Sequence, residues 1–256
     1  FNNFKNTFLN LHNPSKETDI FSNDFRRVAY DEIFANLLTL FSARKTAKIK
    51  KKEKKMYTNK LSKIVKKNFK YELTDKQNKV LIDLDNDLKS SNRMFRLLQG
   101  DVGSGKTILA LIAAANVIDS NYQVAFMAPT EILAKQHYEL AKKLFLSTNV
   151  VINLLTSKTL PHEKKKIIEE TEEGSSKFLF GTHSLFQKKI DFKRLGLIII
   201  DEQHKFGVNQ RKKLSDKGGE NCDILLMTAT PIPRTLTMTI YGDMDLSIIR
   251  EKPKTR

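Results

Sequence analysis

The sequence predicts an α/β fold in which a mostly parallel sheet carries helices on both faces. From residue 73 onward short apolar runs alternate with helical patterns, and this alternation is typical of parallel sheets. A glycine-rich loop at Gly100–Thr107 follows one apolar run and precedes a helical pattern. A later apolar run, Leu197–Ile200, ends in Asp201 and Glu202. These observations indicate a ligand site beyond the carboxyl ends of the strands, where both features fall.

Each expected element has a short pattern of its own. The helices are expected at Lys106–Asp119, Glu131–Leu146 and His162–Glu173, where apolar residues recur every three or four positions. The strands are expected at the brief apolar runs Arg96–Leu98, Gln123–Ala128, Val150–Leu155, Phe178–Gly181, Leu195–Asp201 and Asp223–Thr228.

The loop at Gly100–Thr107 completes the phosphate-binding pattern G-x-x-x-x-G-K-[ST]. Its glycines let backbone N–H groups converge on phosphate oxygens, and the following helix adds positive potential at its N-terminus. Lys106 is placed to reach the β- and γ-phosphates of ATP, and the Thr107 hydroxyl is placed to ligate Mg²⁺. A glycine-rich turn without a ligand is the alternative. The expected nucleotide-binding set is Gly100, Gly103, Ser104, Gly105, Lys106 and Thr107.

The two acids after Leu197–Ile200 supply what the loop lacks. Phosphoryl transfer to water needs a metal anchor and a group that orients the water. Asp201 is the natural Mg²⁺ partner, and Glu202 would polarise the attacking water. Acids after a strand can also merely cap the next helix. With the phosphate loop upstream, we expect Lys106, Asp201 and Glu202 to form the catalytic set.

The composition favours a polyanionic partner. The chain has 256 residues and a formal net charge of +16, which supports nucleic-acid binding. Its single cysteine, Cys222, excludes an internal disulfide framework and fits a reducing cytoplasm. No apolar run approaches the roughly 20 residues that span a bilayer, so we expect no membrane partner. Because the chain begins with Phe1, we expect it to be a piece of a longer protein.

Residues 1–70 are expected to form a helical segment that precedes the sheet. Phe25–Ser42 carries apolar residues at helical spacing, and a helix that docks on a neighbouring domain is the simplest interpretation. Arg44–Lys67 contains twelve Lys or Arg residues and one acid, Glu53. A helix that tracks DNA and a solvated helical face are equally good interpretations of this lysine-rich segment.

A series of segments resembles the motifs of superfamily 2 helicases, and specifically the RecG family of bacterial branched-DNA helicases. The resemblance covers residues 71–250, and Arg26–Phe41 resembles the helix before the motor in that family. It implies a RecA-like P-loop NTPase domain at 71–250, the first of two motor lobes, and the start of a linker at 251–256. The segments are Leu73–Gln77, Leu97–Thr107, Met127–Ala134, Gly181–Gln187, Ile200–Val208 and Met227–Leu236.

The resemblance also assigns roles that the residues alone do not. Gln77 falls at the position of the glutamine that binds the adenine edge in the family. An amide suits this role because it both donates and accepts hydrogen bonds. Tyr71 stands at an aromatic position that stacks on the base. The alternatives are an ordinary glutamine near a helix start and a core tyrosine. The residues that would couple nucleotide state to the grip on DNA are Gln203, His204, Thr228, Ala229 and Thr230.

Two turns after strands match DNA-contact positions of the family. One is Pro129, Thr130 and Glu131, and the other contains Thr182 and His183. Hydroxyl and backbone N–H groups at such helix starts can bind a DNA phosphate. A plain helix cap is the alternative at both turns.

Three departures from the family pattern lie outside the nucleotide chemistry. Ser157 stands where glycine is usual, and Lys205 stands where arginine is usual. The segment before Arg256 lacks the usual Pro-Gly. The first departure leaves close backbone approach to DNA in question, and the second loses a bidentate donor.

The resemblance implies an ATP- and Mg²⁺-dependent translocase that acts on replication forks and Holliday junctions during recombination and repair. We expect a cytoplasmic monomer whose second RecA-like lobe and wedge domain lie elsewhere in the same full-length chain. The isolated lobe should then bind nucleotide weakly and hydrolyse ATP poorly. The alternatives are a transcription-repair coupling translocase or another superfamily 2 helicase, and a non-catalytic nucleic-acid-binding module. Ser104 and Gln203-His204 favour RecG over the translocase, whereas an intact nucleotide site argues against the module.

Overall fold

The structure is a computed structural model that divides into two compact units. It describes residues 3–13, 21–49, 52–182, 185, 190–202, 219, 221–230 and 244–249. One unit comprises Phe1–Ile49 and Ile232–Met244, and the other comprises Lys50–Pro231 and Asp245–Arg256. The second unit therefore includes the part of the chain from residue 52 to residue 70 that we expected to precede the sheet domain.

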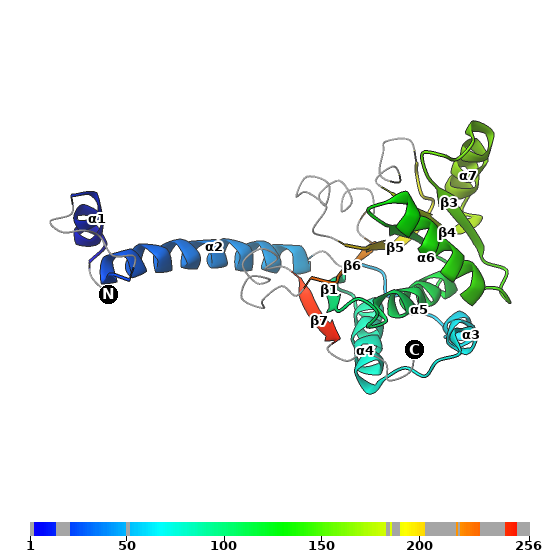
Figure 1. Cartoon of the computed structure of the whole chain (residues 1–256), viewed down its shortest axis with the longest axis horizontal. Helices are drawn as coiled ribbons and strands as arrows, with labels where there is room; N and C mark the ends of the chain where they lie inside the picture. Colours follow the sequence, from blue (N-terminus) through cyan, green and yellow to red (C-terminus); the bar gives the residue numbers. More distant parts are fainter. Residues whose placement is uncertain are drawn as a thin grey trace. The chain divides into compact units, whose positions relative to one another are not determined.

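The described part of the first unit contains two helices, α1 (Phe4–His12) and α2 (Asn23–Ile49) (Figure 1). Asp24, in the first turn of α2, ties them together by accepting hydrogen bonds from Thr7 at 3.0 Å and Asn10 at 3.1 Å. The helix expected over Phe25–Ser42 is thus present and longer. Its apolar side chains at Ile33, Phe34, Leu37 and Leu38 are 40–52% exposed. Docking of this face on a neighbouring domain stays a prediction.

The second unit is built on a sheet of seven strands, all parallel among the described residues, in the order β3-β4-β2-β5-β6-β1-β7. The predicted parallel sheet is confirmed. We did not expect β7, because its alternating pattern is short and it lies at the edge beside β1. The strands are β1 (Phe95–Gly100), β2 (Gln123–Met127), β3 (Val151–Leu155), β4 (Ser176–Gly181), β5 (Leu195–Ile200), β6 (Asp223–Thr228) and β7 (Asp245–Ile249).

Helices surround this sheet in the described part of the unit (Figure 1). The right-handed crossovers that parallel strands require place α5 and α6 on one face and α7 on the other. The helix α5 is apolar on nearly all sides because it is buried along almost its whole length. The helices are α3 (Lys60–Phe69), α4 (Asp75–Lys89), α5 (Lys106–Asp119), α6 (Glu131–Leu144) and α7 (Pro161–Glu173).

Both interpretations assumed one helix through the lysine-rich segment, but its described helical residues belong to two. Residues 44–49 end α2, and residues 60–67 lie in α3, whose Lys60, Lys63, Lys66 and Lys67 are exposed, so DNA contact there stays a prediction. The chain from residue 52 to residue 58 is not helical, and Lys52 and Lys55 are buried with no exposed side-chain area. A sequence pattern leads one to expect that every lysine is exposed to solvent. Here Lys52 and Lys55 are buried instead, because each forms an ion pair with the buried carboxylate of Asp223. The following helix, α3, packs against α5 and α6.

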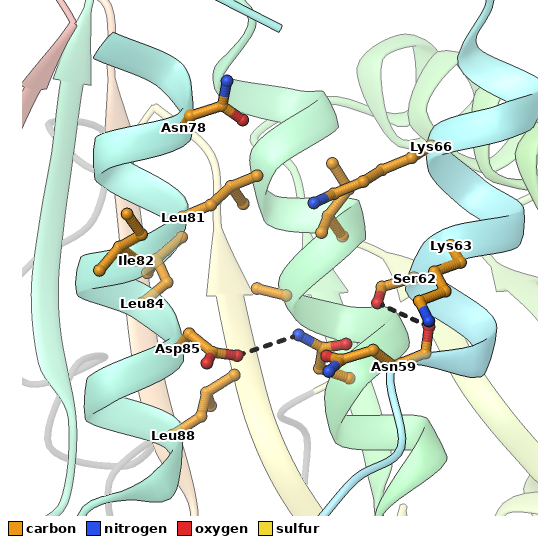
Figure 2. Close-up of a pocket in the computed structure, with 13 residues that line it drawn as sticks. Asn59, Ser62, Lys63, Lys66, Asn78, Leu81, Ile82, Leu84, Asp85 and Leu88 are labelled. Atoms are coloured by element: carbon orange, nitrogen blue, oxygen red, sulfur yellow. Dashed lines mark hydrogen bonds between the residues drawn. The ribbon is translucent and has the colours of Figure 1, made fainter. Parts of the chain in front are cut away.

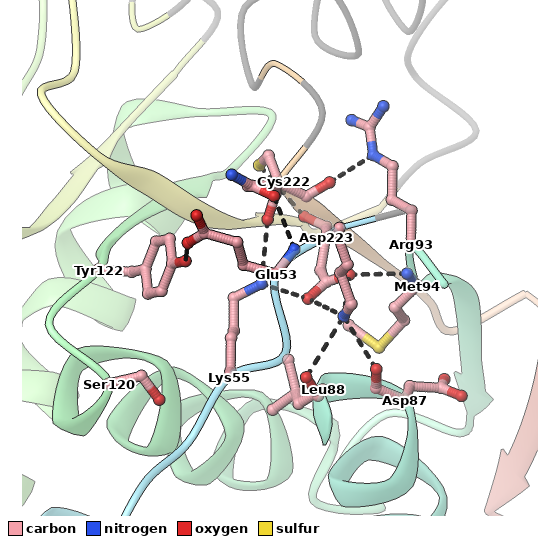
Figure 3. A network of polar contacts seen from close by, with 12 residues as sticks. Glu53, Lys55, Asp87, Leu88, Arg93, Met94, Ser120, Tyr122, Cys222 and Asp223 are labelled. Carbon is pink, nitrogen blue, oxygen red and sulfur yellow. Dashed lines mark hydrogen bonds and ion pairs between the residues drawn. The ribbon is translucent and has the colours of Figure 1, made fainter. Parts of the chain in front are cut away.

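Asp223 is the centre of this buried network, which we name the Asp223 clamp: Lys52, Lys55, Met94 and Asp223 (Figure 3). Lys52 donates to both carboxylate oxygens at 2.7 Å, and Lys55 donates to Oδ2 at 2.6 Å. The backbone N–H of Met94 donates to Oδ1 at 2.7 Å. Burial lowers the pKa of Lys52, while the charge of Asp223 acts in the opposite direction. The clamp fastens the segment before α3 to the start of β6.

Candidate nucleotide and nucleic-acid site

The phosphate loop follows the carboxyl end of β1 and forms a tight turn. Gly103 and Gly105 have φ angles of 81° and 90°, in the left-handed region that glycine adopts without strain. The Ser104 N–H donates to the Asp101 carbonyl at 3.1 Å, while the buried Ser104 hydroxyl has no hydrogen-bond partner among the residues that the structure describes. A Cβ on Gly100 would lie 2.5 Å from that hydroxyl oxygen. The loop is therefore a tight cradle in which a side chain at Gly100 would clash.

Lys106 reaches back across this cradle. Its Nζ donates to the carbonyl of Gly100 at 2.6 Å and to that of Asp101 at 3.0 Å. Burial lowers the pKa of Lys106, and the charges of Asp201, Glu202 and Asp101 act in the opposite direction. The amine is thus held at the loop, within electrostatic reach of the two acids that follow β5.

Gln77 joins α4 to the phosphate loop. Its Oε1 accepts from the Thr74 N–H at 2.9 Å, and its own N–H donates to the Thr74 hydroxyl at 3.3 Å, which makes a capping box. Its Nε2 donates to the Ser104 carbonyl at 2.8 Å. A Cβ on Gly105 would lie 2.4 Å from this Nε2. Gln77 thus supports the loop backbone here, and its reading of adenine stays a prediction.

Asp201 continues directly from β5 and is buried. Its N–H donates to the Met127 carbonyl at 2.9 Å. The carboxylate Oδ1 accepts from the Glu202 N–H at 3.1 Å, and Oδ2 lies 2.8 Å from Nε2 of His137 on α6. The sequence did not suggest His137, because it lies in the buried stripe of α6 with Ala134, Ala141 and Leu144. A polar residue in such a stripe is the signal that could have identified it.

Glu202 has a strained backbone. Its φ angle is 51°, in a region where a non-glycine residue costs about 1–3 kcal/mol and which often marks functional sites. Lys106 follows the loop after β1 and Glu202 follows β5, so both residues lie beyond the carboxyl ends of parallel strands. The structure therefore brings Lys106, Asp201 and Glu202 to one edge of the sheet.

The aromatic position at Tyr71 is open to solvent. Tyr71 is 61% exposed and packs edge-on against Phe69, with ring centroids 5.4 Å apart. It lines a pocket of about 370 Å³ with residues of α3 and α4, including Lys66 and Asn78. A core tyrosine is thus the wrong alternative, while base stacking stays a prediction.

A second pocket of about 420 Å³ lies between α3, α4 and α5 (Figure 2). It also includes Lys66 and Asn78, so the two pockets adjoin. Its floor is apolar, with Leu81, Leu84 and Leu88 of α4. None of the predicted catalytic residues lines either pocket.

The turns predicted to contact DNA follow β2 and β4 at the same edge of the sheet. Thr130 is the exposed N-cap of α6, and its hydroxyl accepts from the Leu133 N–H at 3.3 Å. Glu131 accepts from the Ser157 N–H at 2.7 Å, and hydrogen bonding to Ser157, from its side chain first and its backbone second, lowers the pKa of Glu131. Pro129 is half-buried before the cap, and Thr182 is half-buried directly after β4. The capping geometry is present, and the DNA contacts stay predictions.

The predicted coupling segment continues from β6. Thr228 is buried, and its hydroxyl accepts from the Thr230 N–H at 3.2 Å and lies 2.8 Å from the Thr230 hydroxyl. Ala229 is half-buried between them. Three further predicted site residues lie outside the described part of the chain, namely His183, Gln203 and His204.

Comparison with known proteins decides the family. The model of the DEAD/DEAH box helicases matches residues 74–239, which include the phosphate loop and both acids. The chain belongs to the DEAD/DEAH box helicase family. The predicted helicase family is therefore confirmed.

The resemblance to RecG is confirmed as well. This helicase is 43% identical to the ATP-dependent DNA helicase RecG of Borreliella burgdorferi over 96% of the chain and 35% of the relative. It is 44% identical to RecG of Aquifex aeolicus over 96% of the chain and 32% of the relative. A solved structure of RecG bound to a three-way DNA junction matches with a TM-score of 0.80 and 39% identity, over 90% of this chain and 31% of that one.

The chain spans about a third of the length of these relatives. In the described residues, no helix is long and apolar enough to cross a membrane.

Proposed function

We propose that this helicase is the ATP-binding motor lobe of a RecG-type translocase that acts on branched DNA. The observation that carries the proposal is the convergence of Lys106, Asp201 and Glu202 beside a loop of backbone donors. The similarity to RecG, including a structure bound to a three-way junction, supports branched DNA as the substrate. In the full-length protein, a second RecA-like lobe and a wedge domain would complete the translocase.

The residues present fit a nucleotide with its divalent cation. The unpartnered Ser104 hydroxyl and the crowded glycines leave a cradle that a triphosphate would fill. The Thr107 hydroxyl and the Asp201 carboxylate offer the hard oxygen ligands that Mg²⁺ prefers. When bound, Mg²⁺ would neutralise charge on the β- and γ-phosphates.

Each predicted site residue would then have a separate role. Lys106 would exchange its backbone carbonyl partners for phosphate oxygens. Glu202, directly after Asp201 at the end of β5, would accept a proton from the attacking water. Thr130 and Thr182 would hold the DNA backbone, and the segment Thr228–Thr230 would sense the nucleotide at the neighbouring strand end.

ATP hydrolysis by the full-length protein tests the proposal. We would compare forked DNA, Holliday junctions, linear duplex and RNA, with Lys106→Ala as the control. We expect branched DNA to stimulate turnover most and Lys106→Ala to reduce it by at least about 100-fold. Activity that ignores branching would favour the coupling translocase, and no activity with any nucleic acid would favour a binding module.

A further inference from the structure

His137 and Asp201 form a buried polar pair behind the nucleotide site. The Nε2 of His137 lies 2.8 Å from Oδ2 of Asp201, and the two residues are 9% and 8% exposed. The imidazole ring also lies against Phe126 of β2, with ring centroids 4.7 Å apart. Phe126 is fully buried and stacks on Phe180 of β4. The ring of His137 is therefore held by packing on one side and by a hydrogen bond on the other.

The direction of this hydrogen bond follows from the partners. An ionised carboxylate only accepts, so Nε2 of His137 carries the proton and donates to Asp201. The other carboxylate oxygen, Oδ1, accepts from the Glu202 N–H at 3.1 Å. Among the described residues, each oxygen of Asp201 thus has one protein donor, and these two donors orient the carboxylate. Each oxygen keeps lone-pair capacity for a further partner.

The pair also joins two parts of the site that are far apart in sequence. His137 lies on α6, whose first turn carries the predicted DNA contacts Thr130 and Glu131. Asp201 follows β5, which pairs with β2. The hydrogen bond is therefore a direct contact between the helix predicted to meet DNA and the carboxylate predicted to hold the metal.

We propose that His137 is a positioning residue that orients Asp201 for Mg²⁺ in the nucleotide site. This inference rests on the proposed function. Partners of metal-binding carboxylates orient them, and the loss of such a partner typically lowers metal affinity about 10- to 100-fold. Without the donor at Nε2, the carboxylate of Asp201 would be free to rotate away from the phosphate loop.

The test compares a donor and a non-donor at position 137. His137→Gln keeps an N–H donor at about the reach of Nε2, while His137→Leu keeps apolar volume without a donor. Glu139→Gln, at an exposed position of α6, is the matched control. Binding of a fluorescent ATP analogue by the chain is measured in EDTA and then as a function of Mg²⁺ concentration.

We expect His137→Leu to raise the half-saturating Mg²⁺ concentration by at least about 10-fold. His137→Gln and Glu139→Gln should stay within about threefold of the wild type, and affinity in EDTA should be equal in all four proteins. This pattern separates positioning from a structural role, because a damaged fold would lower Mg²⁺-free binding as well. If His137→Leu does not fold, His137→Met replaces it as the non-donor.

Two results would overturn the inference. One is an unchanged Mg²⁺ requirement in the non-donor variant, and the other is an equal increase in His137→Gln. Failure of the proposed function looks different, since the wild-type chain itself would then bind no nucleotide with or without Mg²⁺; that result would remove the basis of the inference as well.

Discussion

The two ends of strand β6 differ in how their polar groups are used. At its amino end, the carboxylate of Asp223 accepts hydrogen bonds from Lys52, Lys55 and the Met94 backbone. Near its carboxyl end, the buried Ser104 hydroxyl has no partner in the described part of the chain. There Lys106 donates to the loop carbonyls of Gly100 and Asp101. The polar groups at the amino end are paired with one another and stabilise the fold. Those near the carboxyl end remain able to bind a ligand.

The contrast has an energetic basis. A buried ion is tolerated only when its partners replace water, and removal of one partner leaves an uncompensated charge. A ligand site keeps polar groups that the fold leaves partly unsatisfied, at some cost to stability. Mutations at the amino end should therefore change stability, and those at the carboxyl end should change nucleotide binding.

The largest expected effect is that of Asp223→Asn in the Asp223 clamp. The variant leaves the ammonium groups of Lys52 and Lys55 buried without a countercharge. We expect the free energy of unfolding to fall by about 3–5 kcal/mol, as measured by urea denaturation. Glu169→Gln is the control, because Glu169 pairs with Lys165 at 3.9 Å with both side chains more than half exposed. It should change stability by less than about 0.5 kcal/mol. An equal effect of both variants would contradict the contrast.

Gly105→Ala should affect both properties. The φ angle of 90° costs alanine roughly 1–2 kcal/mol, and the new Cβ would displace the Gln77 amide from the Ser104 carbonyl. We expect binding of a fluorescent ATP analogue to weaken by at least about 10-fold, or roughly 1.4 kcal/mol. Gly174→Ala has a similar φ of 82° but meets only the flexible Lys193 side chain. It should lose stability alone, and weakened nucleotide binding in Gly174→Ala would argue against a local effect.

Lys52→Met should be milder than Asp223→Asn. Asp223 would still accept from Lys55 and from the Met94 N–H, and one of the two buried cations would be gone. We expect a loss of about 1–3 kcal/mol in urea denaturation. A loss as large as that of Asp223→Asn would mean that Lys55 alone does not compensate the carboxylate.

The smallest effect concerns Cys222, next to the clamp. Burial raises the pKa of its thiol to about 12, so the reactive thiolate is scarce at neutral pH. We expect a thiol reagent to modify the native chain only as fast as it unfolds, and to modify it at once in urea. Asp223→Asn should speed the native reaction. Rapid labelling of the folded wild type would show that the amino end of β6 opens without global unfolding.

The strands and the nucleotide residues were predictable because their signals are local. Runs such as Leu195–Ile200 and Asp223–Thr228 are apolar on both faces, as buried parallel strands are. The phosphate loop has its own glycine pattern, and the helix after it begins at Lys106 and ends at Asp119 as expected. The edge strand β7 was missed because only two of its five residues are buried.

The sequence by itself determined the α/β class, the nucleotide loop and the acids that follow β5, since each depends on neighbours along the chain. Only the tertiary structure decided that Lys52 and Lys55 lie on Asp223 and that His137 lies on Asp201. The residues that make these contacts are 64 to 171 positions apart in the sequence. No local sequence pattern predicts which lysine or histidine is buried, because the carboxylate that pairs with it lies on or directly after a strand that is distant in sequence.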